Sequence, residues 1–227
     1  MTFQALTIEQ LETLASMQDH LNQLTCQANF GHPDWRLMNF NWGLAIIDEV
    51  MEIHGHLGWK WWKGSDKYQV GLTEENKKQV QLEVIDILHF GLSSWLESGR
   101  IVPTISNYDF ELQDTLWELR YNSCSTVFDW SAWTCLCKAV DLNAEDIMKI
   151  YTGKYALNIF RQDHGYGDGS YEKMWFVSIV HCAPMEDNWF LEQALNDLEV
   201  MGKEITAQNV TDQLGIYYEE HINGKRA

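Results

Sequence analysis

The chain has 227 residues, enough for one large domain or two small ones with a real hydrophobic core. Its net charge of −17 leaves no excess of lysine or arginine to replace the counterions of a nucleic-acid backbone, which excludes passive nucleic-acid binding. No apolar run is long enough to span a bilayer and no signal peptide is recognised, so we expect no membrane association. The 5 cysteines are odd in number and lack paired CxxC spacing, which indicates reduced thiols in a cytoplasmic protein.

Helical periodicity dominates the chain, and we expect an all-α fold. Thr7 and Gln10 fit a capping box, which opens a first helix that continues through Leu24. The further helices expected are about 35–57, 73–96, 108–120, 131–140, 143–163 and, as the last one, 189–200. No linker divides the sequence, so we expect a single domain over residues 1–227, with a rigid core and a smaller mobile lobe at about 100–145.

Two short acidic pairs lie in apolar, helix-patterned stretches. Glu49 and Glu52 form the first pair, and Glu83 and Asp86 form the second. Residues three apart share a helix face, so each pair presents two carboxylates side by side. Single pairs of this kind are common on solvated helix faces, but carboxylates in helices this apolar are buried and need partners. Hard oxygen ligands suit Mg²⁺ or Mn²⁺, and the pattern therefore predicts a divalent-metal site within a helical bundle.

Cationic residues gather in two other places. In the segment Trp59–Lys63, two lysines stand among three tryptophans, a pattern typical of a packed aromatic turn or of a wall for a flat base. Lys154, Asn158 and Arg161 recur at i, i+4 and i+7, hence on one helix face. A glycine-rich loop follows at 165–169, without the spacing of a P-loop. These features favour contacts with phosphate groups.

The chain resembles the dimeric all-α dUTPases, relatives of the MazG-like nucleoside triphosphate pyrophosphohydrolases. The two acidic pairs match the ExxE…ExxD pattern of that family, Trp59–Lys63 its tryptophan-lysine segment, and residues 18–22 its N-terminal motif. Blocks at 83–90, 154–166, 169–173 and 186–188 are similar to further motifs, in the expected order. The chain departs from the pattern in a slightly longer gap between Glu52 and Glu83, and in Tyr155, where many relatives have asparagine.

The resemblance implies Mg²⁺-dependent hydrolysis of dUTP to dUMP and pyrophosphate by a cytoplasmic homodimer, in the host cytoplasm if the gene is phage-borne. It implies metal ligation by Glu49, Glu52, Glu83 and Asp86, and a catalytic role toward the attacking water for Glu49 or Glu52. Phosphate contacts are implied for Lys63, Lys154, Arg161, Tyr166 and Lys173. Nucleoside contacts are implied for Gln18, Asn22, Trp62, His89, Phe90 and Asn158.

Two alternatives remain open at this point. One is a pyrophosphohydrolase for dCTP or another nucleoside triphosphate, because an amide side chain can read either a carbonyl or an amino group by flipping. The other is an acidic binding protein, such as a DNA mimic or an inhibitor, which the net charge of −17 permits. That alternative predicts dispersed surface carboxylates and gives no reason for acidic pairs embedded in apolar helices.

Overall fold

The computed structural model describes residues 6–65, 68–100, 105–106, 110–124, 128–177 and 183–226. These residues form eight α-helices and one two-stranded hairpin, which confirms the predicted all-α class. The helices are α1 (Ile8–Phe30), α2 (Trp42–Leu57), α3 (Lys77–Glu97), α4 (Leu112–Asn122), α5 (Trp130–Ala139), α6 (Ala144–Asp163), α7 (Asp187–Val200) and α8 (Ala207–Arg226). Among the described residues, no helix combines the length and the apolar character that a membrane span requires.

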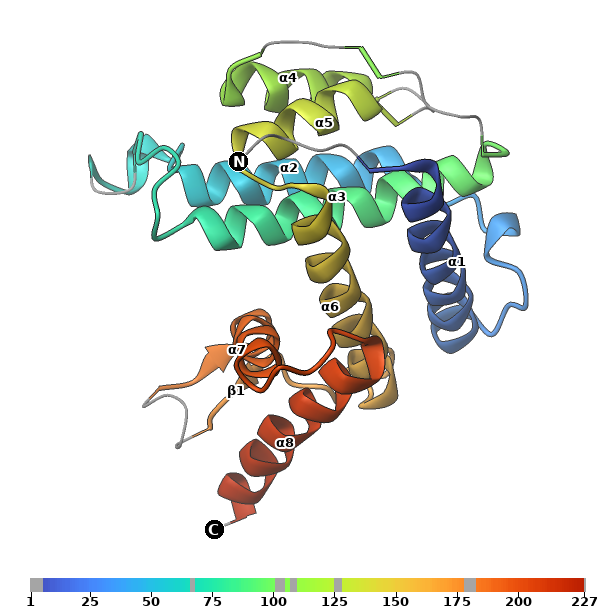
Figure 1. Ribbon diagram of the computed structural model, residues 1–227, viewed down its shortest axis with the longest axis vertical. Coiled ribbons are helices and arrows are strands. Elements are labelled where there is room, and N and C mark those ends of the chain that lie inside the picture. The colour runs from blue at the N-terminus through green and yellow to red at the C-terminus, as the bar shows by residue number, and fades with distance from the viewer. Residues whose placement is uncertain are drawn as a thin grey trace. The chain divides into compact units, whose positions relative to one another are not determined.

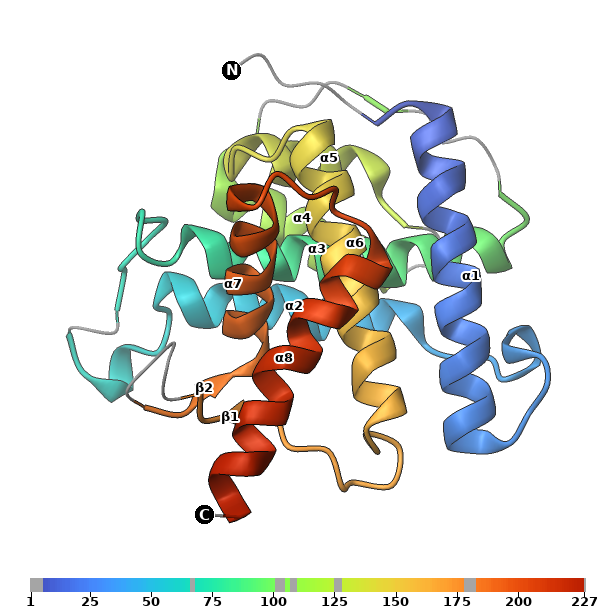
Figure 2. The same ribbon diagram turned by 60° about the horizontal axis from the view of Figure 1, so that its bottom comes forward.

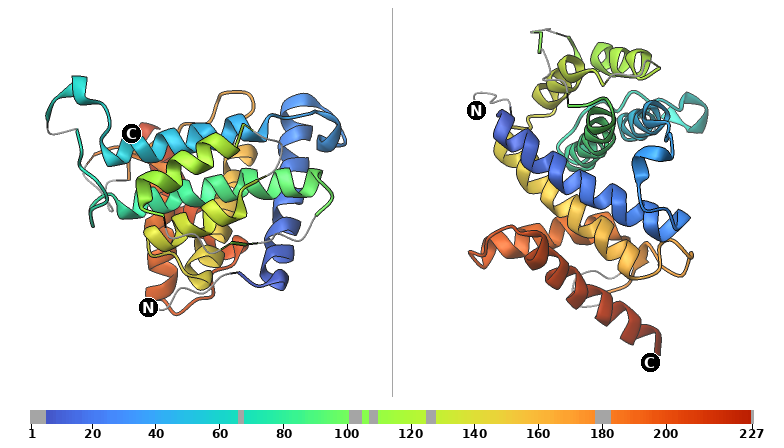
Figure 3. Two further views of the ribbon diagram at one scale, coloured as in Figure 1. Left: turned by 90° about the horizontal axis from the view of Figure 1, so that it is seen from above. Right: turned by 90° about the vertical axis from the view of Figure 1, so that its right-hand side faces the viewer.

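The chain divides into two compact units. Unit 1 comprises Met1–Asp19 and Arg36–Ile150. Within it α2 and α3 run antiparallel and side by side, and α4 and α5 pack against them (Figures 1 and 3). Val50 and Ile53 of α2 and Val84 and Leu88 of α3 are fully buried in this core. Since the acidic pairs share turns with these residues, the packing of α2 against α3 determines where the carboxylates lie.

Unit 2 comprises His20–Trp35 and Tyr151–Ala227. It contains most of α6, the helices α7 and α8, and the hairpin of β1 (Met174–Trp175) with β2 (Met185–Glu186), labelled in Figure 2. Its core is aromatic: the buried Trp175 stacks on Phe190 with ring centroids 5.3 Å apart and lies 5.8 Å from Phe160. The core of unit 2 therefore fixes α6, α7 and the hairpin with respect to one another.

The expected lobe at about 100–145 contains α4 and α5, which belong to unit 1. Tyr108, at which we expected a helix to start, lies outside the described residues. The single-domain interpretation stays a prediction. No disulfide joins the four described cysteines to one another, and the fifth, Cys182, lies outside the described residues.

Most predicted helix starts agree with the structure. The Thr7 backbone N–H donates to Gln10 Oε1 at 2.8 Å and the Gln10 N–H donates to Thr7 Oγ1 at 3.2 Å, which is the expected capping box. Asn143 Oδ1 likewise accepts from the first N–H groups of α6. The predicted helix over 35–57 was wrong at its start. Asn39 adopts a positive φ of 50° and Asn41 caps α2, so only a short 3-10 turn precedes the helix proper.

The helix α8 corrects the prediction that the last helix ends near residue 200. Its buried residues Val210, Leu214, Tyr217 and His221 recur at intervals of four, three and four, a regular helical stripe. Thr206 Oγ1 accepts from the Asn209 N–H and caps the start. The stripe was missed because two of its four members are amphipathic aromatic side chains, which a purely aliphatic pattern does not count.

Two glycines of unit 1 give a matched test of helix packing. A Cβ added at Gly91 of α3 would lie 2.6 Å from two atoms of the buried Phe128 ring, whereas a Cβ at Gly55 of α2 would meet nothing within 4 Å. We expect Gly91→Ala to lower the free energy of unfolding by about 1–3 kcal/mol through overpacking. Gly55→Ala should instead raise it by about 0.5–1 kcal/mol, because alanine loses less conformational entropy in a helix. Urea unfolding of both variants checks the pair, and equal effects would contradict the packing at Gly91.

Candidate active site

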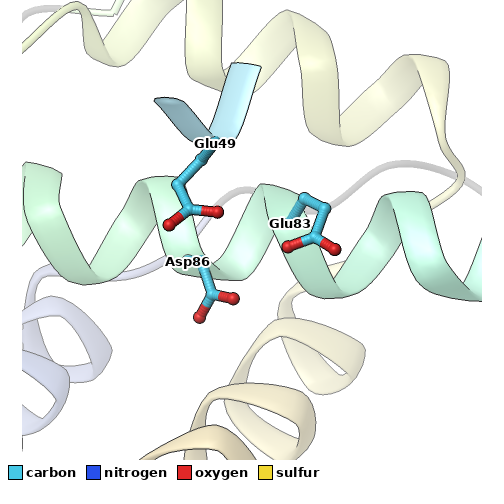
Figure 4. A group of neighbouring side chains, drawn as sticks. All are labelled: Glu49, Glu83 and Asp86. Atoms are coloured by element: carbon cyan, nitrogen blue, oxygen red, sulfur yellow. The ribbon is translucent and has the colours of Figure 1, made fainter. Parts of the chain in front are cut away.

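Three carboxylates meet where α2 packs against α3. Glu49, Glu83 and Asp86 each offer an oxygen, and these oxygens all lie within 4.8 Å of one another. Figure 4 shows Glu49 reaching from α2 toward the two acidic residues of α3. Glu83 is buried, with only 4% of its surface exposed, and the other two are half-buried. Gathered like charges repel and are costly to desolvate, so this arrangement calls for a cation.

Glu52 differs from the other three predicted ligands. It is an exposed residue of the described chain and lies outside the group of three. His56 also adjoins the group, and its Nε2 lies 3.3 Å from Glu83 Oε1. His56 follows Glu49 by seven residues, two helical turns, and therefore lies on the same face of α2. The three gathered carboxylates provide the hard, anionic oxygen donors that Mg²⁺ or Mn²⁺ prefers, so the site fits a divalent cation of this kind.

Two of the predicted nucleoside-binding residues form a buried pair in unit 1. Gln18 of α1 is 3% exposed, and its Oε1 lies 2.6 Å from Nδ1 of the buried His89 on α3. A carbonyl oxygen can only accept, so Nδ1 of His89 carries the proton and donates it to this bond. The pair holds the Gln18 amide in one orientation. Asn22, the other predicted amide on α1, is half-buried one turn further along the helix.

The aromatic residues that were predicted to contact the nucleoside differ in exposure and in the rings they pack against. Phe90 is half-buried and stacks on Trp42, with centroids 6.5 Å apart and an interplanar angle of 28°. Trp62 is 54% exposed and meets Trp59 and Trp61 edge to face. Lys63 ends the same short 3-10 turn and is exposed. The tryptophan-lysine segment is therefore an open aromatic surface of unit 1.

The cationic face of α6 is engaged by the start of α7, within unit 2. Arg161 binds Asp187 through two parallel hydrogen bonds, from Nε to Oδ2 and from one terminal nitrogen to Oδ1, both 2.8 Å long. Its other terminal nitrogen donates to Asn158 Oδ1 at 3.1 Å, and the Tyr171 hydroxyl donates to Asp187 Oδ2 at 2.7 Å. Burial and the charge of Asp187 raise the pKa of Tyr171 far above its usual value, so it remains a neutral phenol.

Asp187 itself is 1% exposed. Burial raises the pKa of its carboxyl, but the hydrogen bonds and charge of Arg161 outweigh burial, so the pKa lies below the ordinary aspartate value. Lys154 is also buried, with 2% exposed, and its Nζ donates to Asn188 Oδ1 at 3.1 Å. The exposed Lys173 lies over the ring of Tyr166, with Nζ 5.6 Å from the centroid. The five predicted phosphate contacts thus range from exposed to buried.

The sequence interpretation gave no role to His56, Asp187 or Asn188. His56 could have been found from its spacing to Glu49 on α2. Asp187 and Asn188 belong to the block at 186–188 that resembles a family motif, but nothing in the sequence pairs them with cations of α6. Two open pockets, of about 360 and 500 Å³, lie elsewhere in unit 1, and none of the carboxylates gathered at α2 and α3 is among the described residues that line them.

These features define a class of protein: an all-α enzyme with a candidate divalent-metal site between two antiparallel helices and with cationic side chains suited to phosphate. The model of the dUTPase family matches residues 10–166, more than half of the chain, and the chain belongs to this family. It is a dUTP diphosphatase, a nucleoside triphosphate pyrophosphohydrolase that acts on dUTP. Comparison with curated proteins gives no match. Tyr171, Lys173, Asp187 and Asn188 lie beyond the matched residues.

Proposed function

We propose that the enzyme depends on Mg²⁺, with Mn²⁺ as a substitute, and that Glu49, Glu83 and Asp86 hold the ion. The observation that carries this proposal is the gathering of their oxygens within 4.8 Å of one another. Glu52, one turn along α2, completes the proposed set of ligands. When bound, a divalent cation at this place neutralises phosphate charge and makes a water molecule more acidic.

The side chains of the chain itself have separate proposed roles. Glu49 or Glu52 orients the attacking water or accepts its proton, since a carboxylate within hydrogen-bond reach serves as a general base. Phosphate oxygens are bound by Lys63, Lys154, Arg161, Tyr166 and Lys173, where cationic donors stabilise charge that develops during transfer. The half-exposed Tyr166 and exposed Lys173 and Lys63 support this role most directly.

The nucleoside is proposed to be read by amide and aromatic side chains. Gln18 and Asn22 contact the uracil edge, with His89 fixing the Gln18 amide through the bond described above. Trp62 or Phe90 lies against the face of the base, and Asn158 contacts the sugar or a phosphate. The fixed orientation of the Gln18 amide supports discrimination of uracil from cytosine, because an amide held by a neighbour cannot flip freely.

A substrate panel tests these proposals. We expect Mg²⁺-dependent release of pyrophosphate from dUTP, with dCTP, dTTP and UTP at least ~10²-fold slower in kcat/KM, as expected where buried polar groups read the base and the sugar. Removal of the metal by a chelator should abolish activity, and Mg²⁺ or Mn²⁺ should restore it. Comparable rates with dCTP would favour the alternative of a broader pyrophosphohydrolase, and full activity in chelator would overturn the metal proposal.

We further propose that the enzyme is a cytoplasmic homodimer. The exposed rings of Trp117 and Tyr121 on α4 support an interface, since exposed aromatic surface of this kind marks association sites. Sedimentation analysis should give twice the mass of the chain, and a monomer at micromolar concentration would contradict the proposal. Membership of an enzyme family removes the reason for the alternative of an acidic DNA mimic or inhibitor, which rested on net charge alone.

A further inference from the structure

The first two residues of α7 hold two cations of α6. Asp187 binds Arg161 and Asn188 binds Lys154, and the two cations stand seven residues apart on one face of α6. Asp187 is itself fixed by the Tyr171 hydroxyl and by its own backbone N–H, which donates to the Lys173 carbonyl of the hairpin at 2.8 Å. The start of α7 is thus tied both to the hairpin and to the cationic face.

The two partners of the ion pair differ in their exposure to solvent. The Arg161 side chain retains 12% of its surface in contact with solvent, whereas the Asp187 side chain retains 2%. Arg161 therefore keeps some contact with solvent, whereas the Asp187 carboxylate is closed off from it. Asp187 occupies one edge of the guanidinium with two hydrogen bonds, and Asn158 accepts from the remaining terminal nitrogen. Together they fix the plane of the guanidinium before any ligand arrives.

Stability alone does not account for this arrangement. A buried ion pair contributes little compared with apolar packing of the same volume, because desolvation offsets the Coulombic attraction. An unrestrained arginine side chain, in contrast, loses rotamer entropy when it is fixed by a ligand. A guanidinium that is already fixed loses less entropy when it binds a ligand, so the ligand binds more tightly. This gain in affinity applies only to the phosphate part of the ligand.

We propose that Asp187 is a positioning residue, which holds the Arg161 guanidinium in the orientation that binds the phosphates of the substrate. This inference rests on the proposed phosphate role of Arg161 and extends it to residues beyond the range matched by the family model. Tyr171 acts through Asp187, because its hydroxyl occupies the carboxylate oxygen that also accepts from Arg161 Nε.

The test compares binding of a non-hydrolysable imido analogue of dUTP with binding of deoxyuridine, by calorimetry in Mg²⁺. Asp187→Asn should bind the analogue at least ~10-fold more weakly than the wild type does. The reason is that a binding group held out of position contributes much less to affinity, even when the displacement is small. Affinity for deoxyuridine, which has no phosphate, should stay at the wild-type value. A purely structural role for Asp187 would change both affinities together or neither, and either result overturns the proposal.

A matched control lies on the same helix. Asp197 of α7 accepts a hydrogen bond from the Tyr217 hydroxyl at 2.6 Å, without an arginine partner among its described hydrogen bonds. Asp197→Asn removes an equivalent tyrosine–carboxylate bond and should leave both affinities unchanged. Tyr171→Phe, which deletes one hydroxyl only, serves if Asp187→Asn fails to fold, and it should weaken the analogue alone. Wild-type affinity for the analogue in Tyr171→Phe would count against the proposal.

The phosphate role of Arg161 can be tested separately. Arg161→Lys should weaken the analogue and spare deoxyuridine. If Arg161→Lys binds the analogue like the wild type, the proposed role of Arg161 fails and the positioning role of Asp187 fails with it. If Arg161→Lys is weakened and Asp187→Asn is not, Arg161 binds phosphate without help from Asp187, and only the positioning role is overturned.

Discussion

Glu49→Gln should abolish dUTP hydrolysis while making the metal-free protein more stable. We expect kcat to fall by ~10³-fold or more, within the range for the loss of a positioned carboxylate. The two effects have one cause. In the metal-free protein the Glu49 carboxylate is repelled by Glu83 and Asp86, whose oxygens lie within 4.8 Å. Glutamine retains the size of the side chain and removes the charge, so repulsion falls together with affinity for the cation.

Thermal unfolding with and without Mg²⁺ separates these effects. Without metal, the wild type should have a lower Tm than Glu49→Gln. Mg²⁺ should raise the Tm of the wild type strongly, because a ligand that binds only the folded state stabilises it by mass action. Mg²⁺ should raise the Tm of Glu49→Gln only a little. The matched control is Asp48→Asn, which removes an exposed charge from the neighbouring position of α2 and should retain activity and the response to Mg²⁺. A fully active Glu49→Gln would exclude the proposed site.

The helices and the acidic pair of α3 could be predicted because both depend on local spacing. The approach of Glu49 to that pair depends on the packing of α2 against α3. Glu83 and Asp86 share a face of any helix, and the apolar residues around them place that face in the interior. The same reasoning gave α6 and its capping residue Asn143. It failed at Trp35–Asn41, where a left-handed Asn39 interrupts an apparently continuous pattern. A single positive φ leaves too weak a signal in the residue types around it.

The long-range pairs could not be predicted, because residues distant in sequence determine them. Spacing places Lys154 and Arg161 on one helix face, which favours contacts with phosphate groups. The structure buries Lys154 against Asn188 and pairs Arg161 with Asp187, 34 and 26 residues further along the chain. The pairing of a given acid with a given cation depends on the packing of α6 with α7. The periodicity of the sequence does not indicate this pairing.

The Arg161–Asp187 pair leads to the second large effect. Arg161→Ala leaves the Asp187 carboxylate buried without its bidentate partner, and we expect the free energy of unfolding near neutral pH to fall by about 3–5 kcal/mol. The double variant Arg161→Ala with Asp187→Asn should recover most of this loss, because the amide needs no countercharge. Chemical denaturation of the single and double variants measures the difference.

The pH dependence of stability should reverse between the wild type and Arg161→Ala. In the wild type the pKa of Asp187 lies below its ordinary value, so its contribution to stability is present above an unfolded-state pKa of about 3.9. That contribution is lost as the pH falls through the lower folded-state pKa. In Arg161→Ala burial prevails and raises the folded-state pKa, so the variant is relatively more stable in acid and loses stability as the pH rises through that value.

The deficit of Arg161→Ala relative to the double variant should therefore narrow on acidification, because the double variant has no carboxyl at position 187. Tyr171 strengthens the contrast, because its neutral hydroxyl still donates to Asp187 in the single variant but supplies no charge. If the single and double variants lose equal stability at every pH, the carboxylate is not trapped in the interior when Arg161 is removed. The start of α7 would then rearrange to reach water, and the tie that Asp187 makes to the hairpin would be weaker than its hydrogen bonds indicate.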